Sequence, residues 1–352
     1  MKIDSLHLQN FRGFEALNLA FNPSFTLLVG ENGAGKTAVL EAVSVALGAF
    51  FLGLKKAAAR PLTRDDVRHQ IYEHSGQLDL QPQWPVIVSA RGTIEGKNLT
   101  WKRTLKGADG RTTRVGAGDL RKLTEKLTRA VMAGKPRSLP VLAYYGTQRL
   151  WLHKKITEAK RGVGSRYDGY IDCLDSASNH RLLTEWMYQQ TLVELQRREE
   201  VSQLRAVENA VCQCIEGATR FYYDVRSQDL QVERAGGDLR PFSFLSDGYR
   251  NLVAMVADIA WRASVLNPHL GADAAAQSEG VVLNDEIDLH LHPRWQRHVL
   301  GNLRRTFPGL QFVATTHSPQ VISSARREEV RHCGRRTALL RPVRAPGLEA
   351  LS

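Results

Sequence analysis

A glycine-rich octapeptide that follows a short apolar run limits what this chain can fold into more than any other feature. Residues 25–29 read FTLLV, and residues 30–37 read GENGAGKT. The octapeptide matches the pattern GxxxxGK[ST], and helical spacing of apolar residues (Val39, Leu40, Val43) begins directly after it. A buried strand, a phosphate loop and a helix are therefore expected in this order, as in α/β proteins that bind nucleotides.

The residue types in the phosphate loop (residues 30–37) suit phosphate chemistry. Its glycines let backbone N–H groups curl around phosphate oxygens, and the start of the helix adds positive potential. We expect Lys36 to reach the β- and γ-phosphates and Thr37 to bind Mg²⁺ through its hydroxyl. A glycine-rich turn without a ligand is the alternative, which the complete pattern in this context disfavours. The residues expected to contact ATP are Gly30, Asn32, Gly33, Gly35, Lys36 and Thr37.

A second candidate element is an apolar strand that ends in two carboxylates. Residues 281–283 read VVL, and Asn284, Asp285 and Glu286 follow. We expect Asp285 to hold Mg²⁺ through water and Glu286 to polarise the attacking water as a general base. A solvated turn is the alternative for an isolated Asp-Glu pair, but the phosphate loop upstream favours the catalytic interpretation. Asn284 stands where an aliphatic residue is expected, so its buried amide needs partners.

The basic residues of this 352-residue chain are unevenly distributed. The formal net charge is +12, yet residues 97–137 carry twelve Lys/Arg against three Asp/Glu. Residues 149–166 carry six against one, and residues 326–352 carry seven against three. These segments suit DNA, RNA or another polyanion, although an ordinary solvated surface is an equal alternative. Few aromatic residues lie among them, so a base-stacking platform is not indicated.

The remaining composition narrows the protein class. The longest uncharged apolar stretch, residues 42–54, is shorter than the ~18 residues of a membrane span, so no membrane partner is expected. The first ten residues lack the apolar region of a secretory signal. Four cysteines are too few for a disulfide framework, so a reducing cytoplasm is the expected location.

Hydrophobic periodicity gives a coarse outline in which strands and helices alternate, as expected for an α/β core. A β-hairpin is predicted over residues 3–21, and a flexible loop over residues 107–118. Further strands are predicted at residues 86–88, 99–101, 141–145, 281–283 and 312–315, with a hairpin at 221–225 and 230–232. Helices are predicted over residues 181–216, over 252–261 and after Pro293.

Two further motifs complete a set of four in a fixed order. Residues 245–250 read LSDGYR before an apolar helix, and residues 315–319 read TTHSP after a buried strand. With the phosphate loop and the acidic strand end, this order resembles ABC-type ATPase heads of the SMC/RecF group. Residues 10–14, NFRGF, also look like an element of the first hairpin of this group. The resemblance runs from Met1 to about Ser324 and implies ATP and Mg²⁺ as ligands.

The resemblance implies an ABC ATPase head with a β-rich N-terminal lobe, a RecA-like parallel-sheet core and a helical insertion lobe. In this division the whole chain, residues 1–352, is one head. The expected parts are residues 1–150 with the phosphate loop, 151–244 as the helical insertion, 245–325 with the signature, Walker B and switch-histidine motifs, and 326–352 as a basic tail.

Roles for individual residues follow from the resemblance. Ser246 and Gly248 would contact the γ-phosphate of ATP held by a second subunit, so two heads would sandwich two ATP molecules. His317 would sense the γ-phosphate, and Gln148 would link Mg²⁺ to the helical lobe. Arg12 would contact nucleotide phosphates. Asp288 would belong to the loop that crosses the dimer interface, where His290 and His292 are expected to pack or hydrogen-bond.

The sequence departs from the LSGGQ form of the signature at Asp247 and Tyr249. The DEIDLHLHP and YYGTQRLW runs and the LSDGYR form look like compact bacterial ATPases of anti-phage defence, of the Septu or retron-associated type. In those systems the ATPase pairs with a separately encoded nuclease or toxin. A DNA repair ATPase that acts on ends or gaps, an ATP-binding scaffold with little turnover, and the disfavoured head of a transporter are the alternatives.

Overall fold

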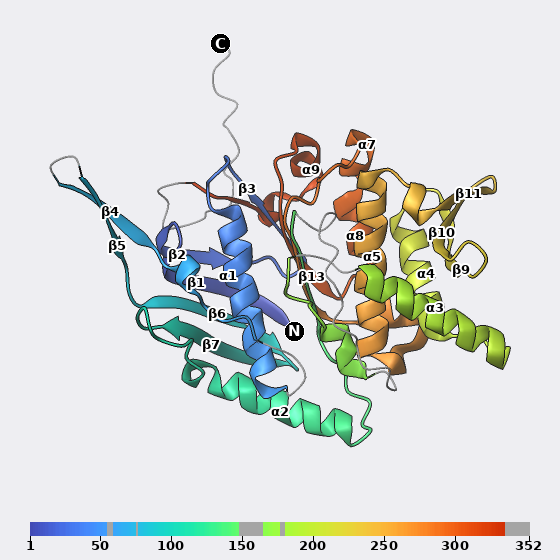
Figure 1. Ribbon diagram of the computed structural model, residues 1–352, viewed down its shortest axis with the longest axis horizontal. Helices are drawn as coiled ribbons and strands as arrows, with labels where there is room; N and C mark the ends of the chain where they lie inside the picture. Colours follow the sequence, from blue (N-terminus) through green and yellow to red (C-terminus); the bar gives the residue numbers. More distant parts are fainter. Residues whose placement is uncertain (55–58, 75–76, 148–164, 177–179, 335–352) are drawn as a thin grey trace, which may run out of the picture.

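A parallel β-sheet lies at the centre of the molecule and positions the candidate site (Figure 1). The computed structural model describes residues 1–54, 59–74, 77–147, 165–176 and 180–334. Within these residues the sheet has the strand order β14-β3-β13-β12-β8. Its strands are β14 (Val330–His332), β3 (Phe25–Val29), β13 (Leu310–Thr315), β12 (Gly280–Asn284) and β8 (Val141–Tyr145). Four of them are buried along their whole length, which explains their mostly apolar sequences.

The carboxyl ends of these parallel strands meet at one edge of the sheet. In the register of the sheet, Asn284 of β12 lies beside Tyr145 of β8 and Ala314 of β13. Thr315 of β13 lies beside Leu28 of β3. The phosphate loop, the acidic pair and the Thr-Thr-His segment therefore emerge side by side, although long stretches of chain separate them.

Helix α1 (Lys36–Gly48) is packed between the parallel sheet and a second, antiparallel sheet (Figure 1). The second sheet has the strand order β2-β1-β6-β7. Its strands are β1 (Lys2–Phe11), β2 (Phe14–Ala20), β6 (Val86–Ile94) and β7 (Lys97–Leu105). Buried Trp101 of β7 donates a 2.9 Å hydrogen bond to the carbonyl of Ala46, which fixes the helix to this sheet. Helix α2 (Gly118–Met132) packs against the 3-10 turn Ala49–Gly53, at the end of α1 away from the phosphate loop.

A helical lobe with a small antiparallel sheet lies on the other side of the parallel sheet (Figure 1). Helix α4 packs against both α5 and α8, and the small sheet has the strand order β11-β10-β9. The long helices are α3 (His180–Arg197), α4 (Ser202–Cys214), α5 (Asp247–Leu266) and α8 (Val299–Thr306). The strands are β9 (Ala218–Asp224), β10 (Asp229–Arg234) and β11 (Asp238–Pro241). Short helices are α6 (Ala274–Gln277), α7 (Pro293–Gln296) and α9 (Pro319–Ser324).

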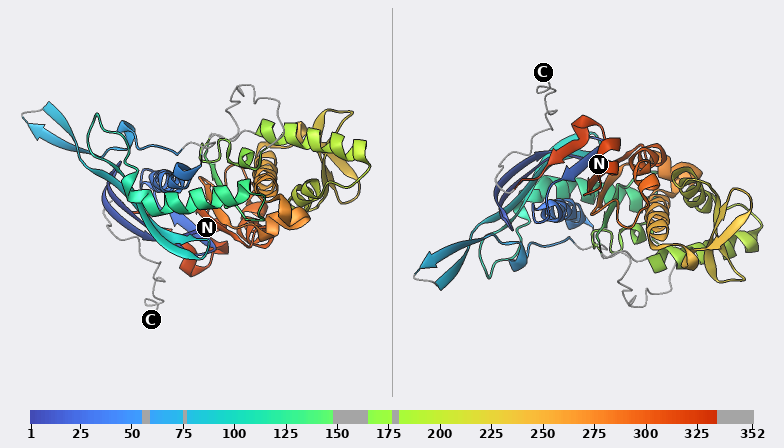
Figure 2. Two further views of the ribbon diagram at one scale, coloured as in Figure 1. Left: turned by 90° about the horizontal axis from the view of Figure 1, so that it is seen from below. Right: turned by 90° about the horizontal axis from the view of Figure 1, so that it is seen from above.

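Strands β4 (His69–His74) and β5 (Gln77–Pro82) form a separate two-stranded hairpin, which we call the arm. Figure 2 shows the arm standing clear of the rest of the molecule in both views. The chain enters and leaves it beside the turn of the first hairpin, where Val67 bridges to Phe11. Sequence periodicity did not predict this arm.

The α/β architecture and the hairpin at residues 3–21 agree with the sequence predictions. The prediction of a loop over residues 107–118 is correct as far as a short 3-10 turn at Val115–Ala117, after which α2 begins. Residues 326–334, assigned to a basic tail from composition, form a 3-10 turn and the edge strand β14 of the central sheet. The rest of the expected tail, residues 335–352, lies outside the described residues.

One helical stretch of the described chain, Lys36–Gly53, is long and apolar enough to pass a test for membrane-spanning helices. However, 72% of it is buried inside the fold. It consists of α1 and the following 3-10 turn, Ala49–Gly53, and its first residue is the phosphate-loop lysine. The apolar composition of this stretch is therefore explained by its place in the core between the two sheets.

Candidate functional site

The phosphate loop needs glycine at particular positions because of its backbone and its close neighbours. Gly30, Gly33 and Gly35 have φ angles of 153°, 76° and 89°. A Cβ atom on Gly30 would lie 2.5 Å from the carbonyl oxygen of Cys333, and one on Gly35 would lie 2.5 Å from the ring of Phe14. The chain after edge strand β14 and the first hairpin thus pack so closely against the loop that no side chain fits at Gly30 or Gly35.

The ammonium group of Lys36 is held inside the phosphate loop. The side chain is buried, and its Nζ donates hydrogen bonds of 2.9 Å to the carbonyl oxygens of both Gly30 and Glu31. A positive charge is therefore fixed at the centre of a turn whose glycines permit close approach of an anion. Asn32, by contrast, lies exposed at the outer side of the loop.

The phosphate loop and the acidic strand end are joined by direct hydrogen bonds. The hydroxyl of Thr37 donates to Oδ2 of Asp285 at 2.8 Å, and the hydroxyl of Thr315 donates to Oδ1 at 2.6 Å. The same Thr315 oxygen accepts a 2.7 Å bond from the backbone N–H of Glu286. The backbone N–H of Asp285 donates to the carbonyl of Tyr145 at the end of β8. The start of α1 and the end of β13 thus fix the buried carboxylate, and the end of β8 fixes the backbone of the same residue.

Glu286 has a backbone conformation that non-glycine residues rarely adopt. Its φ angle is 50°, in the left-handed region, and its side chain is half-buried. Such a conformation costs on the order of 1–3 kcal/mol and persists only where surrounding contacts impose it. The bond from its N–H to Thr315 and the bond from the N–H of Leu289 to its carbonyl impose it here.

The residues at this edge fit the Mg²⁺ that ABC-type heads use with ATP. Among the described residues no group of three or more His, Cys, Asp and Glu side chains could hold a metal ion. The Thr37 hydroxyl and the Asp285 carboxylate are nonetheless adjacent oxygen donors beside a fixed lysine. Mg²⁺ characteristically takes one or two protein oxygens and completes its shell with water and substrate phosphates. This donor set therefore suits a metal that arrives with a nucleotide.

The loop after Glu286 is tied to the segment that carries the predicted switch histidine. The hydroxyl of Thr316 hydrogen-bonds to the carboxylate of Asp288 and also accepts a 3.0 Å bond from the N–H of Ser318. His317 lies between these anchored residues and is exposed. His292 accepts a bond from the N–H of Arg294 and caps α7, in agreement with its expected role in hydrogen bonding.

Ser246 and Gly248 differ in their surroundings. Ser246 is the exposed N-cap residue of α5, and its side chain makes no capping hydrogen bond to the helix. Gly248 is buried, and a Cβ atom on it would lie 1.9 Å from the carbonyl oxygen of His290. The signature loop and the loop after Glu286 are thus in direct backbone contact within one subunit. The contact of Ser246 and Gly248 with a second subunit's ATP stays a prediction.

The departures from LSGGQ have structural explanations. Tyr249 is buried, and its ring lies 4.9 Å from the ring of Trp295, so it belongs to the packing between α5 and α7. Asp247 is exposed in the first turn of α5 and forms a 2.6 Å ion pair with Arg250. An acidic residue at this position complements the helix dipole.

Asn284 is buried, as expected for the last residue of β12. Its Nδ2 donates a 2.8 Å hydrogen bond to the sulfur of Met255 on α5, and its Oδ1 has no hydrogen-bond partner among the described residues. Of the two polar atoms of this amide, only the nitrogen therefore has a partner among the described residues. The amide lies directly before the two catalytic candidates, between the central sheet and the signature helix.

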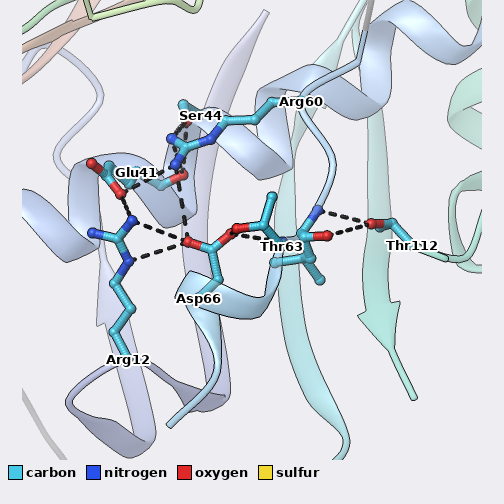
Figure 3. Close-up of polar contacts among 8 residues, drawn as sticks. Arg12, Glu41, Ser44, Arg60, Thr63, Asp66 and Thr112 are labelled. Atoms are coloured by element: carbon cyan, nitrogen blue, oxygen red, sulfur yellow. Dashed lines mark hydrogen bonds and ion pairs between the residues drawn. The ribbon is translucent and has the colours of Figure 1, made fainter. Parts of the chain in front are cut away.

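Arg12 lies in a compact charge cluster with residues that the sequence did not single out (Figure 3). It forms ion pairs with Glu41 of α1 and, at 3.1 Å, with Asp66, whose side chain is almost fully buried. Arg60 forms a second ion pair with Glu41 at 3.1 Å and donates a 2.6 Å bond to Ser44. Arg12 therefore fastens the first hairpin to α1, and its predicted contact with phosphate stays a prediction.

A buried network that sequence reasoning missed connects β8 to the signature helix. The hydroxyl of Tyr145 donates a 2.6 Å hydrogen bond to Asp258 of α5, which also forms a 2.8 Å ion pair with Arg262. Arg262 continues to the carbonyls of Gly169 and Ile171. Burial raises the pKa of Tyr145 well above its ordinary value, and nearby Asp258 raises it further, so the hydroxyl stays protonated. The i, i+4 spacing of an acid and a base inside an apolar helix was the available signal.

Gln148 and the basic segment at residues 149–164 lie outside the described residues. The basic segment at residues 97–137 is described, and it forms β7, α2 and their connection. Eleven of its twelve basic side chains are exposed; Arg103 is buried, and burial lowers its pKa. The part of this basic surface on α2 is remote from the start of α1, because α2 lies beside the other end of that helix (Figure 1).

The phosphate loop, the fixed Asp285 and the signature loop on this layered α/β fold define an ATPase head of the ABC type. A family model described as "AAA domain" matches residues 5–217, and a second AAA-domain model matches residues 148–323. The chain therefore belongs to the AAA-domain family of ATPases.

Comparisons with individual proteins agree with this assignment. The chain is 24% identical to the "Retron Ec83 probable ATPase" of Escherichia coli, over 91% of this chain and 69% of that protein. It is 21% identical to the "Septu protein PtuA" of Bacillus thuringiensis, over 92% of this chain and 73% of that protein. The crystal structure of an Smc head bound to the C-terminal winged-helix domain of ScpA superposes with a TM-score of 0.57 and 18% identity. It covers 97% of this chain and 98% of that one.

The likeness to the Smc head confirms the predicted fold, an SMC-type head with a mixed α/β core. The similarity to Septu and retron ATPases that the LSDGYR, DEIDLHLHP and YYGTQRLW runs indicated is also confirmed. The roles of the individual site residues stay predictions.

Proposed function

We propose that this chain hydrolyses ATP, dimerises when it binds ATP, and through this cycle controls a separate effector, a nuclease or toxin, in bacterial anti-phage defence. The observation that carries the proposal is the Asp285 carboxylate, fixed by Thr37 of the phosphate loop and by Thr315 of β13. This arrangement joins a phosphate site and a magnesium site, and the imposed turn at Glu286 follows it directly.

In the proposed mechanism, Lys36 and the N–H groups of the phosphate loop hold the β- and γ-phosphates. Thr37 and Asp285 would hold Mg²⁺. When bound, Mg²⁺ neutralises charge on the phosphate oxygens. Glu286 accepts a proton from the attacking water, and its imposed backbone conformation sets the direction of the carboxylate. His317, exposed at the same edge of the sheet, would sense the γ-phosphate.

The second subunit enters through the signature loop. Ser246 is exposed, and the first turn of α5 offers N–H groups that have no intrahelical partners, which suits an anion supplied by a second subunit. Gly248 contacts the backbone of His290. If the signature loop moves when it binds this anion, the loop that follows Glu286 would therefore move with it. Dimerisation would thus complete the site and adjust it in one event.

The assignment to defence rests on similarity to Septu and retron ATPases over most of the chain. The family resemblance implies that the ATPase acts with a separately encoded effector. The identity of the neighbouring open reading frames tests this part, because a nuclease or reverse transcriptase beside this frame favours defence.

The catalytic part is tested with two variants and a control. Glu286→Gln should retain ATP binding, form a stable dimer with ATP and lose turnover by about 10²–10⁴-fold, since it lacks the general base. Lys36→Ala should lose ATP binding. Glu199→Gln changes the same type of group at an exposed position remote from the site and should match the wild type. Unchanged phosphate release by Glu286→Gln would refute the role of Glu286.

A repair or recombination ATPase that acts on DNA ends or gaps is the second candidate, and the exposed basic residues of β7 and α2 favour it. Affinity of the purified dimer for DNA should then fall with salt in proportion to the phosphates contacted. Charge reversal at Lys122, Lys126 and Arg129 should reduce both the affinity and its salt dependence. DNA binding that does not depend on salt would exclude this basic surface as the DNA-binding site.

A scaffold that binds ATP with little turnover is the third candidate. The observation that favours it is Oδ1 of Asn284, next to Asp285, which has no hydrogen-bond partner in the part of the chain that the structure describes. Such a scaffold would bind ATP and dimerise in the wild type as it does in Glu286→Gln, with no difference in phosphate release. A clear difference between the two proteins would exclude it.

A further inference from the structure

One residue connects the acidic strand end to the helix that carries the signature loop. The carbonyl of Tyr145, at the end of β8, accepts a 2.8 Å hydrogen bond from the N–H of Asp285. The hydroxyl of the same residue donates a 2.6 Å hydrogen bond to Asp258 of α5. Tyr145 is 3% exposed and Asp258 is 5% exposed, so both bonds lie in the interior. Ser246 of the signature loop is the N-cap of this helix, so Tyr145 joins the two halves of the proposed nucleotide site.

The contact with Asp258 belongs to a longer chain of polar contacts. Asp258 forms a 2.8 Å ion pair with Arg262, one turn further along α5. Arg262 donates hydrogen bonds of 2.8 Å and 3.0 Å to the carbonyls of Gly169 and Ile171. The segment at residues 169–171 is therefore fastened to α5 by the same buried charges that accept the hydroxyl of Tyr145.

The segment that follows returns to β8 and closes the chain of contacts into a ring. The N–H of Tyr144 donates a 2.7 Å hydrogen bond to the carbonyl of Cys173, and the N–H of Gly146 donates a 2.8 Å bond to the carbonyl of Ser176. These donors lie on either side of Tyr145 in the sequence. The end of β8 is thus held to α5 by two routes, directly through the hydroxyl of Tyr145 and indirectly through residues 169–176.

The neighbouring strand end contacts the same face of α5. Asn284 lies beside Tyr145 in the register of the sheet, and its Nδ2 donates a 2.8 Å hydrogen bond to the sulfur of Met255. Met255 and Asp258 are three residues apart, so they share one face of the helix. Apolar packing is non-directional, whereas hydrogen bonds to a buried charge are directional and strong. These contacts therefore fix the place of α5 on the sheet more closely than packing alone.

The proposed dimer requires a defined spacing between two loops of one subunit. The phosphate loop holds the subunit's own ATP, while the signature loop meets the ATP of the second copy. A two-fold dimer makes both contacts at once, so the two loops of each subunit must be spaced to match those of its partner. A spacing that is already correct in the single subunit lowers the cost of association.

We propose that Tyr145 is a positioning residue that, through Asp258, holds the signature helix at a preset place relative to the phosphate loop. The preset signature loop receives the ATP of a second copy of this chain. The inference rests on the proposed ATP-dependent dimer and deepens it, because it names the bond that prepares one subunit for the other. Tyr145 acts through α5 and takes no part in the chemical step.

The dissociation constant of the dimer tests this role. Tyr145→Phe keeps the carbonyl bond to Asp285 and the ion pair of Asp258 but removes the hydroxyl. In the Glu286→Gln background with ATP and Mg²⁺, it should weaken the dimer by about tenfold, with unchanged ATP affinity of the monomer. Tyr170→Phe is the matched control, because it removes an equally buried hydroxyl that donates to the carbonyl of Pro140 instead of to α5. It should leave the dissociation constant unchanged.

Turnover in the chain that retains Glu286 separates positioning from chemistry. If Tyr145→Phe affects only assembly, its turnover per subunit should fall at low protein concentration and recover when the concentration exceeds the dissociation constant of the variant. A general loss of folded protein would lower turnover by the same factor at every concentration. A loss that persists at high concentration would place Tyr145 in the chemical step and overturn the inference.

The route through Asp258 is tested in a background that lacks the ion pair. With Asp258→Leu and Arg262→Met in place, Tyr145→Phe should weaken the dimer no further, because its partner is already absent. A further tenfold loss in this background would show that Tyr145 acts by another route and would overturn the inference.

The outcomes distinguish this inference from the proposed function. A Tyr145→Phe dimer as stable as the parent dimer, or no weaker than the Tyr170→Phe dimer, would overturn the positioning role and leave the ATP-bound dimer intact. Absence of any dimer of Glu286→Gln with ATP would overturn the proposed dimer and the inference with it.

Discussion

The hydroxyl of Thr37 donates a 2.8 Å hydrogen bond to Asp285, a residue 248 positions further along the chain. This bond connects the end of the phosphate loop to the end of β12, and the 2.6 Å bond from Thr315 adds the end of β13. Asp285 is 5% exposed, so its carboxylate depends on these donors instead of bulk water. The magnesium site and the base site are therefore built on three adjacent strands of one rigid sheet.

Replacement of Thr315 by valine should impair turnover more than nucleotide binding. Valine keeps the shape but removes the donor to Asp285 and the acceptor for the N–H of Glu286. Loss of a partner at a buried polar group costs about 1–3 kcal/mol, and here it relaxes the imposed turn at Glu286. We expect kcat to fall by about tenfold or more while ATP affinity changes little, because 1.4 kcal/mol corresponds to tenfold.

A matched control is Thr26→Val, which removes one hydrogen bond from a buried threonine on β3 away from the carboxylates. It should lower stability with little effect on kcat. Steady-state turnover and equilibrium ATP binding of both variants provide the comparison. Equal losses of kcat in the two variants would show that the effect of Thr315→Val comes from general destabilisation.

Replacement of Gly248 by alanine should separate nucleotide binding from assembly. The new Cβ would lie 1.9 Å from the carbonyl oxygen of His290, so the signature loop or the loop after Glu286 must move. We expect ATP binding at the phosphate loop to persist, while ATP-dependent dimerisation and turnover are lost. Light scattering with ATP, next to a binding isotherm, checks both expectations.

Gly301→Ala is the corresponding control for Gly248→Ala. Gly301 lies in α8 with open space around the position of its Cβ, so alanine should stabilise the helix by about 0.5–1 kcal/mol. Normal dimerisation of Gly248→Ala would show that the backbone at His290 can shift without any effect on assembly.

Breaking the ion pair between Asp258 and Arg262 should lower the free energy of unfolding more than replacing both residues together. Arg262→Met leaves Asp258 buried without its charged partner, and such a change costs about 3–5 kcal/mol. Asp258→Leu combined with Arg262→Met removes both charges and should recover much of that loss. Urea unfolding of the single and double variants measures both effects. A double variant as unstable as Arg262→Met would assign the loss to the neutral groups left without partners, the hydroxyl of Tyr145 and the carbonyls of Gly169 and Ile171.

Local sequence was sufficient to predict the strand ends that carry the site. The phosphate loop is a contiguous pattern between a strand and a helix, and the acidic pair ends a fully apolar strand. Parallel strands bring their carboxyl ends together, so the fold class alone places Lys36 near Asp285. Thr315 was quoted as part of a motif, but its bonds to Asp285 and Glu286 could not be predicted, because they depend on strand order within the sheet.

The partners of Arg12 illustrate what the sequence could not reveal. Asp66 lies 54 residues away and is held by a 3-10 turn with no apolar periodicity, while Glu41 reads as the polar face of α1. A charge cluster of this kind depends on the path of a connecting segment between two lobes. The arm was missed because β4 (His69–His74) does not alternate apolar and polar residues, although Leu78 and Leu80 of β5 do.

Alkaline pH should destabilise the fold through its buried thiols. Burial raises the pKa of Cys173 and Cys214 to about 12 and that of Cys333 to about 11, above the ordinary value of 9.0. In the unfolded chain these thiols ionise near pH 9, while in the folded chain they stay protonated. The unfolded state therefore binds fewer protons above pH 9, and the free energy of unfolding falls as pH rises from about 9 toward 11.

Each thiol contributes a slope that approaches about 1.4 kcal/mol per pH unit above its ordinary pKa. Combined Cys173→Ala, Cys214→Ala and Cys333→Ala should flatten the decline between pH 9 and pH 10. Between pH 7 and pH 8 the variant and the wild type should show the same pH dependence, whatever their absolute stabilities, because no thiol titrates there. Urea midpoints at half-unit pH steps supply the comparison. A decline of equal slope in both proteins above pH 9 would assign the alkaline effect to other groups and leave the buried thiols without a role in it.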